Sequence, residues 1–143
     1  MRLENDVGHF HWKAGMVKVW TNGCFDILHR GHFEMLRYAK TLGDYLIVGI
    51  DSDNKVKQDK GRTRPINCAA DRKYALESIG CVDAVVIFNS AENLAQTIKG
   101  IAPDVMVVGS DWEGKKVVGA EYVGEVRFFN RVGNYSTTRI LKR

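Results

Sequence analysis

The stretch of residues 21–32, Thr-Asn-Gly-Cys-Phe-Asp-Ile-Leu-His-Arg-Gly-His, most constrains how this chain can fold. Residues 17–20 before it form a mostly apolar run typical of a β-strand, and residues 33–42 after it are typical of a helix. α/β proteins bind phosphate at such tight glycine turns, because free backbone N–H groups and the positive end of the helix dipole point at the same place. The sequence therefore predicts an α/β protein with an anion site at this turn.

Two histidines, His29 and His32, flank Gly31 within this stretch. A helix that begins near them brings both imidazoles to one face of its first turn, because residues three apart are neighbours on a helix surface. A single histidine here would be interpreted as a capping or core side chain. The pair around a glycine, between a strand and a helix, instead favours a place that holds an anion whose charge grows during a reaction.

Apolar, strand-like runs alternate with helical segments along the rest of the chain. The run 45–50 is almost continuously apolar, which is typical of a strand buried on both faces of a parallel sheet. Further strands are expected at residues 83–88, 104–108 and 125–129, and helices at residues 67–78, 91–99 and 137–141. This alternation predicts right-handed crossovers and a Rossmann-like, doubly wound α/β fold, with a parallel sheet of about five strands and helices on both faces.

The helix expected at residues 67–78 has a polar start. Asn67 is expected to cap it, because a short side-chain oxygen accepts hydrogen bonds from the first unpaired backbone N–H groups. Arg72 is expected on the outer side of its first turn, where the guanidinium either reaches an anion or forms a surface ion pair. The inner face is expected to comprise Ala70, Tyr74, Ala75, Leu76 and Ile79.

Length and charge fit one small domain. Of the 143 residues, 16–143 are expected to form this domain, and residues 1–15 an N-terminal appendage. The formal net charge of +4 favours anionic ligands, but basic and aromatic residues are too scattered to indicate a nucleic-acid partner. Because no apolar run reaches membrane-spanning length and the N-terminus lacks a signal-peptide core, we expect no membrane partner and a cytoplasmic location.

The cysteines and the N-terminal histidines do not indicate a disulfide framework or a metal site. Cys24, Cys68 and Cys81 are odd in number and form no Cys-x-x-Cys pair, which favours free thiols in a reducing compartment. His9 and His11 stand close together, but two histidines without a third ligand support a metal site only weakly. We therefore expect neither a disulfide framework nor a metal ion held by protein ligands.

A strongly basic segment, residues 55–65, follows the predicted strand at 45–50. It carries five cations in ten residues, namely Lys55, Lys57, Lys60, Arg62 and Arg64. Glycine and proline predict a loop or a short broken helix here. Composition alone equally fits a solvated loop, but the segment leaves the carboxyl end of a strand, the edge at which α/β sheets bind ligands.

The motif Gly-x-Phe-Asp-x-x-His-x-Gly-His at residues 23–32 resembles the signature of the nucleotidyltransferases of the cytidylyltransferase-like superfamily. Residues 21–29, 42–49, 60–61, 64–66 and 117–119 are similar to the adenylyltransferase domain of the bifunctional heptose-phosphate enzyme of lipopolysaccharide synthesis. Residues 108–114, Arg131 and residues 136–138 are equally similar to glycerol-3-phosphate cytidylyltransferase. The heptose enzymes usually have Lys-Gly-Gly-Asp where residues 108–111 read Val-Gly-Ser-Asp, so the resemblance leaves the acceptor open.

The resemblance implies transfer of a nucleoside monophosphate from ATP or CTP to a phosphorylated sugar or polyol, with release of pyrophosphate. The acceptor phosphate is already ionised near pH 7, so the reaction needs alignment and charge stabilisation rather than a general base. His29, His32 and Lys57 are the expected catalytic residues, although the register of the basic segment leaves the choice among Lys55, Lys57 and Lys60 open. A nucleotide-binding regulatory module and a nucleic-acid-binding module are the non-enzymatic alternatives.

The resemblance also implies the other site residues and the partners. Asp26, Lys57 and Arg72 are expected to bind the acceptor substrate, although Asp26 has a second role in pinning the turn through backbone N–H groups. A triphosphate implies Mg²⁺ held mainly by phosphate oxygens and water, and relatives suggest a homodimer. The expected nucleotide-binding residues are Asn22, Gly23, Cys24, Phe25, His29, His32, Lys60, Asp111, Arg131, Ser136, Thr137 and Thr138.

Overall fold

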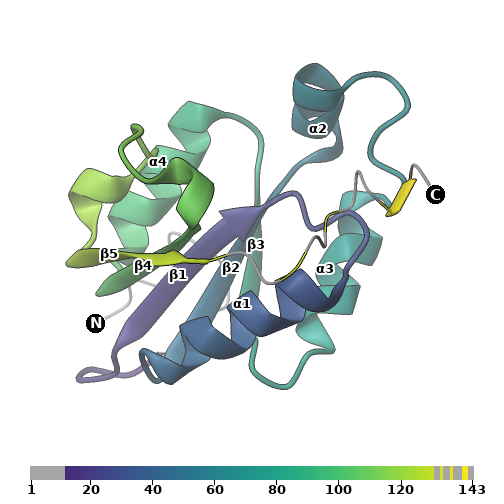
Figure 1. The fold of residues 1–143 in the computed structure, drawn as a ribbon. Coiled ribbons are helices and arrows are strands. Elements are labelled where there is room, and N and C mark those ends of the chain that lie inside the picture. Colours follow the sequence, from purple (N-terminus) through teal and green to yellow (C-terminus); the bar gives the residue numbers. More distant parts are fainter. Residues whose placement is uncertain (1–11, 131–132, 134–135, 137–139, 142–143) are drawn as a thin grey trace.

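The computed structural model describes residues 12–130, 133, 136 and 140–141. Within this part of the chain, five parallel strands form one sheet in the order β3-β2-β1-β4-β5 (Figure 1). The strands are β1 (Lys18–Gly23), β2 (Tyr45–Asp51), β3 (Ala84–Phe88), β4 (Val105–Gly109) and β5 (Glu125–Phe129). The α-helices are α1 (Arg30–Thr41), α2 (Asp53–Lys60), α3 (Ala69–Glu77) and α4 (Ala91–Ile101). The predicted Rossmann-like α/β fold is confirmed.

The strand order creates a switch point next to β1. The chain runs from β1 outward through β2 to β3, and then crosses back to place β4 on the other side of β1. β1 and β2 are in register from Lys18 opposite Tyr45 to Gly23 opposite Ile50. In open α/β sheets a ligand crevice lies at such a switch point, outside the carboxyl ends of the strands.

Two apolar layers cover the two faces of the sheet. Alternate residues of β2 point to opposite faces, so Leu46 packs in the layer with α1 and α3, whereas Ile47 packs in the layer with α4. Both side chains are completely buried. The helices therefore lie on both faces of the sheet, as the sequence predicts (Figure 1). The packed sheet supports the loops at its edge.

Gly49 makes room for the largest core side chain, Trp20. A Cβ at Gly49 would lie 2.5 Å from the Trp20 ring, which is closer than real Cβ contacts, and 3.2 Å from Phe88. The fully buried Trp20 donates its ring N–H to the side-chain oxygen of Asn22 at 2.8 Å. Asn22, at the carboxyl end of β1, is thereby held by a core residue.

The start and the buried face of α3 differ from the sequence-based expectation. The helix begins at Ala69 with Cys68 at the N-cap, because the backbone and side-chain N–H groups of Asn67 are both bonded to Asp26. Tyr74, predicted to face inward, is 75% exposed. Ala70 is also exposed, whereas Leu76 is buried as predicted.

The remaining elements depart from the predictions mainly at their ends. The first helix begins at Arg30 rather than residue 33, and the basic segment contains a regular helix, α2, where a loop or broken helix was expected. Short 3₁₀ turns follow β4 at Ser110–Trp112 and precede β5 at Ala120–Tyr122. Among the described residues, no helix is long and apolar enough to cross a membrane.

Candidate functional site

The carboxyl edge of the sheet gathers most of the predicted site residues that the structure describes. The turn after β1 leads into α1, the segment after β2 is α2, and the turn after β4 holds Asp111 and Trp112. Because parallel strands end at the same edge, these three segments border the switch point between β1 and β4.

The turn between β1 and α1 contains one residue, Phe25, with an unusual backbone conformation. Phe25 adopts a φ of 51°, in the left-handed region that few non-glycine residues occupy. Its side chain is 4% exposed, and its ring centroid lies 5.1 Å from that of His32. A Cβ at Gly23 would lie 3.2 Å from the Phe25 ring. Gly23 therefore lets Phe25 fold back under the turn and support the imidazole of His32.

Asp26 fastens this turn to the segment before α3. Its buried carboxylate accepts the backbone N–H groups of Ile66 and Asn67, each at 2.8 Å, and Nε–H of Arg64 at 3.2 Å. Burial would raise the pKa of Asp26, but the hydrogen bonds from Asn67, Ile66 and Arg64 outweigh it and the pKa is lowered. The predicted pinning through backbone N–H groups is confirmed. The buried carboxylate thus has a structural role, and its expected contact with the acceptor substrate stays a prediction.

His29 and His32 form a reciprocal cap at the start of α1. Nδ1 of His29 accepts the backbone N–H of Gly31 at 3.1 Å, and Nδ1 of His32 accepts the backbone N–H of His29 at 3.2 Å. The ring centroids lie 3.9 Å apart, so the predicted placement of both imidazoles on the first turn is confirmed. Since each Nδ1 is an acceptor, the neutral rings carry their proton on Nε2. The pair therefore presents two N–H donors at a helix N-terminus.

The charge state of His32 suits this arrangement. Burial, followed by the charges of His29 and Lys60, lowers the pKa of His32 from 6.5 to about 4. His32 is consequently neutral near pH 7. It can donate a hydrogen bond to an anion without taking up a proton.

The three lysines of α2 have different surroundings. Nζ of Lys55 lies 3.2 Å from a carboxylate oxygen of Asp51 and 2.8 Å from one of Asp59, and these ion pairs hold it. Lys57 and Lys60 are exposed. Lys60 is close enough to the histidine turn to lower the pKa of His32. Among the three alternatives left open by the sequence, Lys60 is the lysine whose charge acts on His32.

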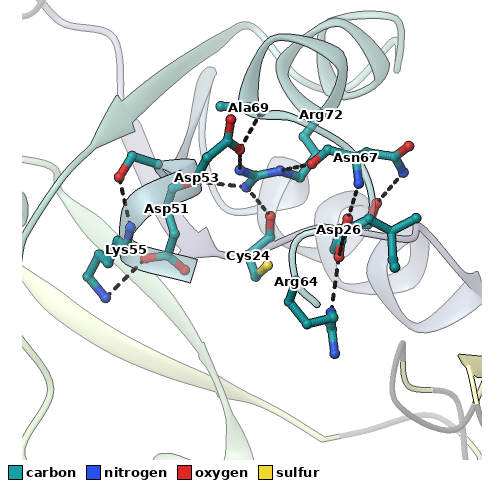
Figure 2. A network of polar contacts seen from close by, with 11 residues as sticks. Cys24, Asp26, Asp51, Asp53, Lys55, Arg64, Asn67, Ala69 and Arg72 are labelled. Carbon is teal, nitrogen blue, oxygen red and sulfur yellow. Dashed lines mark hydrogen bonds and ion pairs between the residues drawn. The ribbon is translucent and has the colours of Figure 1, made fainter. Parts of the chain in front are cut away.

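The prediction that Arg72 lies on the outer side of its helix is wrong. Arg72 is 1% exposed, and its guanidinium lies inside the network shown in Figure 2. It donates to the backbone oxygens of Asn67, Cys24 and Asp51 and to the Asp53 carboxylate, at distances of 2.8–2.9 Å. All of these bonds lie within the protein, and the expected contact of Arg72 with the acceptor substrate stays a prediction.

The other predicted residues are distributed around the same edge. Burial raises the pKa of the half-buried Cys24 thiol, although Lys60 and Arg72 oppose the rise, and all three cysteines are free. Asp111 and Trp112 are exposed, and Ser136 is partly buried with its carbonyl accepting the Ile140 N–H at 3.1 Å. The predicted residues Arg131, Thr137 and Thr138, like His9 and His11, lie outside the described residues.

The polar network under the site was not anticipated from the sequence. Arg64, Asn67 and Asp53 take part in it with Asp26 and Arg72 (Figure 2). One feature of the sequence does indicate that Arg72 is buried. It precedes Leu76 by four residues and therefore shares its helix face. Nη2 of Arg64 is also buried, and no described group accepts its hydrogens.

The described residues contain no group of three histidine, cysteine, aspartate or glutamate side chains arranged to hold a metal ion. The donor set at the edge consists of imidazole N–H groups, backbone N–H groups and ammonium groups. Chemically, these groups suit an anion with several oxygens, such as a polyphosphate.

Residues 20–143 match the family model of cytidylyltransferase-like proteins. The chain belongs to the cytidylyltransferase-like family. It is 47% identical over 131 residues to a bifunctional protein HldE of Campylobacter fetus subsp. fetus, covering 92% of this chain and 28% of that protein. It is 50% identical over 131 residues to a protein of the same name from a Nitratiruptor species, again covering 92% of this chain and 28% of the relative. The chain thus spans little more than a quarter of these curated relatives.

Solved structures support the same family and fold. The lipopolysaccharide core biosynthesis protein of Thermoplasma volcanium matches with a TM-score of 0.68 and 28% identity, covering 83% of this chain and 100% of that chain. A pantothenate synthetase of Thermus thermophilus matches with a TM-score of 0.56 and 14% identity, covering 80% of this chain and 56% of that one. The second similarity concerns the fold alone. Together with the family match, these findings confirm the family resemblance predicted from the motif at residues 23–32.

Proposed function

We propose that this domain is a nucleotidyltransferase, which moves a nucleoside monophosphate from a nucleoside triphosphate to a phosphorylated sugar or polyol. The observation that carries the proposal is the pair of Nε2–H donors of His29 and His32, with Lys60 nearby, at the carboxyl edge of β1. Membership of the cytidylyltransferase-like family supports the same reaction class.

In the proposed reaction, an oxygen of the acceptor phosphate attacks the α-phosphorus of the nucleotide. The bond between the α-phosphorus and the bridging oxygen breaks, and the electron pair leaves with pyrophosphate. The Nε2–H groups of His29 and His32 stabilise the charge that grows on the α- and β-phosphate oxygens, and the N-terminus of α1 adds its dipole. Lys60 holds the leaving pyrophosphate, and Lys57 holds the acceptor phosphate.

The nucleotide is expected to arrive with Mg²⁺, which neutralises phosphate charge. This ion is proposed to be held mainly by phosphate oxygens and water. Gly23 and Cys24 are proposed to approach the nucleotide with their backbone, and Phe25 to support the turn. Asp111 and Ser136, with Arg131, Thr137 and Thr138, are proposed to complete the nucleotide site.

We favour ATP and heptose-1-phosphate as the substrate pair. The support comes from the resemblance of residues 21–29, 60–61 and 64–66 to the heptose adenylyltransferases, and from the bifunctional HldE proteins among the relatives. CTP with glycerol-3-phosphate is the alternative, supported by residues 108–114. The cytoplasmic location and the homodimer remain predictions.

The test is a pyrophosphate-release screen in which four nucleoside triphosphates are combined with a set of phosphorylated acceptors. Release is expected with heptose-1-phosphate and ATP, and mass spectrometry should detect the nucleotide-linked product. Tight nucleotide binding without release for any pair would favour the regulatory-module alternative. Salt-dependent affinity for DNA or RNA, without nucleotide turnover, would favour the nucleic-acid module.

A further inference from the structure

Arg72 is a completely buried charged side chain at this edge, and no step of the proposed reaction uses it. Its side chain has no exposed surface, whereas its partner Asp53 is 41% exposed. Burying a guanidinium is expensive unless hydrogen bonds compensate it. Here the bonds connect four separate places in the chain, so the arginine joins segments that are distant in sequence.

Two of these connections are to the turn after β1 and to the end of β2. One Nη1 atom donates to the carbonyl of Cys24 at 2.9 Å and to the carbonyl of Asp51 at 2.8 Å. Cys24 precedes Phe25 in the turn that leads to the two histidines, and Asp51 is the last residue of β2. Arg72 thus fixes the spacing between the phosphate-binding turn and the point where the chain enters α2.

The other two connections are to α2 and to the start of α3. Nη2 of Arg72 donates to a carboxylate oxygen of Asp53 at 2.9 Å, and the backbone N–H of Ala69 donates to the same oxygen at 2.8 Å. Nε donates to the carbonyl of Asn67 at 2.9 Å. Asp53 is the first residue of α2, so this carboxylate fastens that helix to α3 (Figure 2).

α2 depends on such polar tethers because it has little apolar contact of its own. Of its eight residues, all of them described, Val56 alone is buried. The helix nevertheless brings Lys60 close enough to His32 and Cys24 to shift the pKa of both groups. A helix anchored by one apolar side chain needs a second constraint, and Asp53 supplies one at its first residue.

We propose that Arg72, through Asp53, is a positioning residue that fixes the start of α2 relative to the turn after β1, and thereby positions Lys60 for the phosphate that His29 and His32 are proposed to bind. This inference rests on the proposed function and assigns to Arg72 a role that acts through Asp53. A displacement of a catalytic group by about 1 Å can lower a rate roughly 100-fold, so a rigid tether of this kind affects catalysis directly.

The test compares the turnover number for pyrophosphate release in Arg72→Lys, Asp53→Ala and Asp53→Asn. The first two variants cut the tether from its two ends and should lower turnover roughly 10- to 100-fold. Asp53→Asn keeps a side-chain oxygen that accepts both hydrogen bonds, so it should stay within about threefold of the wild type. Lys73→Gln, which removes a surface pair with Glu77 on the same helix, is the matched control and should leave turnover unchanged.

A double-mutant cycle with Lys60→Gln separates positioning from general stability. Once the ammonium of Lys60 is gone, its position no longer matters, so Asp53→Ala should then cause at most about a twofold further loss. An equal factor in both backgrounds would overturn the proposal. Asp53 is at the surface, so this cycle can be measured even where Arg72→Lys fails to fold.

Hydrogen exchange of the ligand-free protein tests the tether independently of enzymatic turnover. The amides of α2 should exchange faster in Asp53→Ala than in Asp53→Asn, while those of α4 stay unchanged. Equal exchange in α2 would overturn the proposal. A wild type that releases no pyrophosphate with any substrate pair would contradict the proposed function, and the exchange comparison would still decide on the tether.

Discussion

His32 shows how one residue is prepared for anion binding by its surroundings. It is packed against Phe25 and His29, and its Nδ1 accepts a backbone hydrogen bond. Burial, His29 and Lys60 lower its pKa to about 4. The imidazole is therefore neutral at physiological pH, with its one proton on the nitrogen that faces away from the backbone.

The lowered pKa of His32 should make the stability of the protein depend on pH. Between pH 6.5 and about 4 the unfolded chain binds a proton at this residue and the folded chain does not, so stability falls as the pH falls through this window. The expected loss is roughly 3 kcal/mol at most. Urea denaturation of the wild type and His32→Gln at several pH values measures it. The stability advantage of the wild type should shrink toward pH 4, and a constant difference would contradict the shift.

His29 has two roles that substitution can separate. It caps α1 through Nδ1, and its Nε2–H is the proposed donor to phosphate. His29→Ala should lose about 1 kcal/mol of stability with the cap. His29→Asn should recover most of that, because asparagine is a good N-cap residue, yet both variants should lose activity by roughly 10²- to 10³-fold. Melting temperature and pyrophosphate release are the two measurements, and an active His29→Asn would contradict the catalytic role.

At the residue scale, the sequence identified the histidine pair but not the buried arginine. The spacing of His29 and His32 around Gly31 indicates one helix turn directly. The sequence predicted an exposed Arg72 and a buried Tyr74, because apolar side chains are ordinarily preferred in the interior. The structure shows the reverse. The burial of Arg72 depends on carbonyl groups of Cys24 and Asp51, which are brought to it only by the tertiary fold.

At the scale of elements, β2 and β1 fit together because Gly49 has no side chain. The Trp20 ring occupies the space in which a Cβ would lie, 2.5 Å away at the nearest atom. A methyl group there must displace the largest core side chain and, with it, the Asn22 side chain that Trp20 binds. Packing of the first strand and the start of the site are therefore coupled.

Gly49→Ala should destabilise the protein by roughly 1–3 kcal/mol through overpacking. Gly80→Ala is the matched control, because no atom lies within 4 Å of the place that its Cβ would take, and it should change stability by less than about 0.5 kcal/mol. Chemical denaturation measures both. A Gly49→Ala variant as stable as the Gly80→Ala variant would show that the sheet accommodates the methyl group freely.

The order and type of the strands and most helices could be predicted from the sequence. Apolar runs such as residues 45–50 and 125–129 carry the strand pattern, and the second of these matches β5 at both ends. α2 was harder to predict because its sequence is almost entirely polar, with Val56 as its only buried residue in a fully described helix. The start of α3 was misplaced because Asn67 is bonded to Asp26, a contact across 41 residues.

At the scale of the whole molecule, the strand order explains why separate segments form one site. β1 lies at the centre of the sheet with β4 on one side and β2 on the other, so the segments that follow these strands meet at one edge. The imidazoles come from the first of them, Lys60 from α2, and Asp111 from the turn after β4. The sequence predicted this edge, but the choice of Lys60 over Lys55 required the ion pairs that hold Lys55.

The central claim is that one polyphosphate binds all of these segments together. The most direct test is hydrogen exchange with and without a nonhydrolysable analogue of the nucleotide that the pyrophosphate screen selects, in the presence of Mg²⁺. Binding of the analogue should protect residues 23–32, the Lys60 end of α2 and the turn at Ser110–Trp112 simultaneously. Protection confined to a single segment, or found instead at the opposite edge of the sheet, would contradict it.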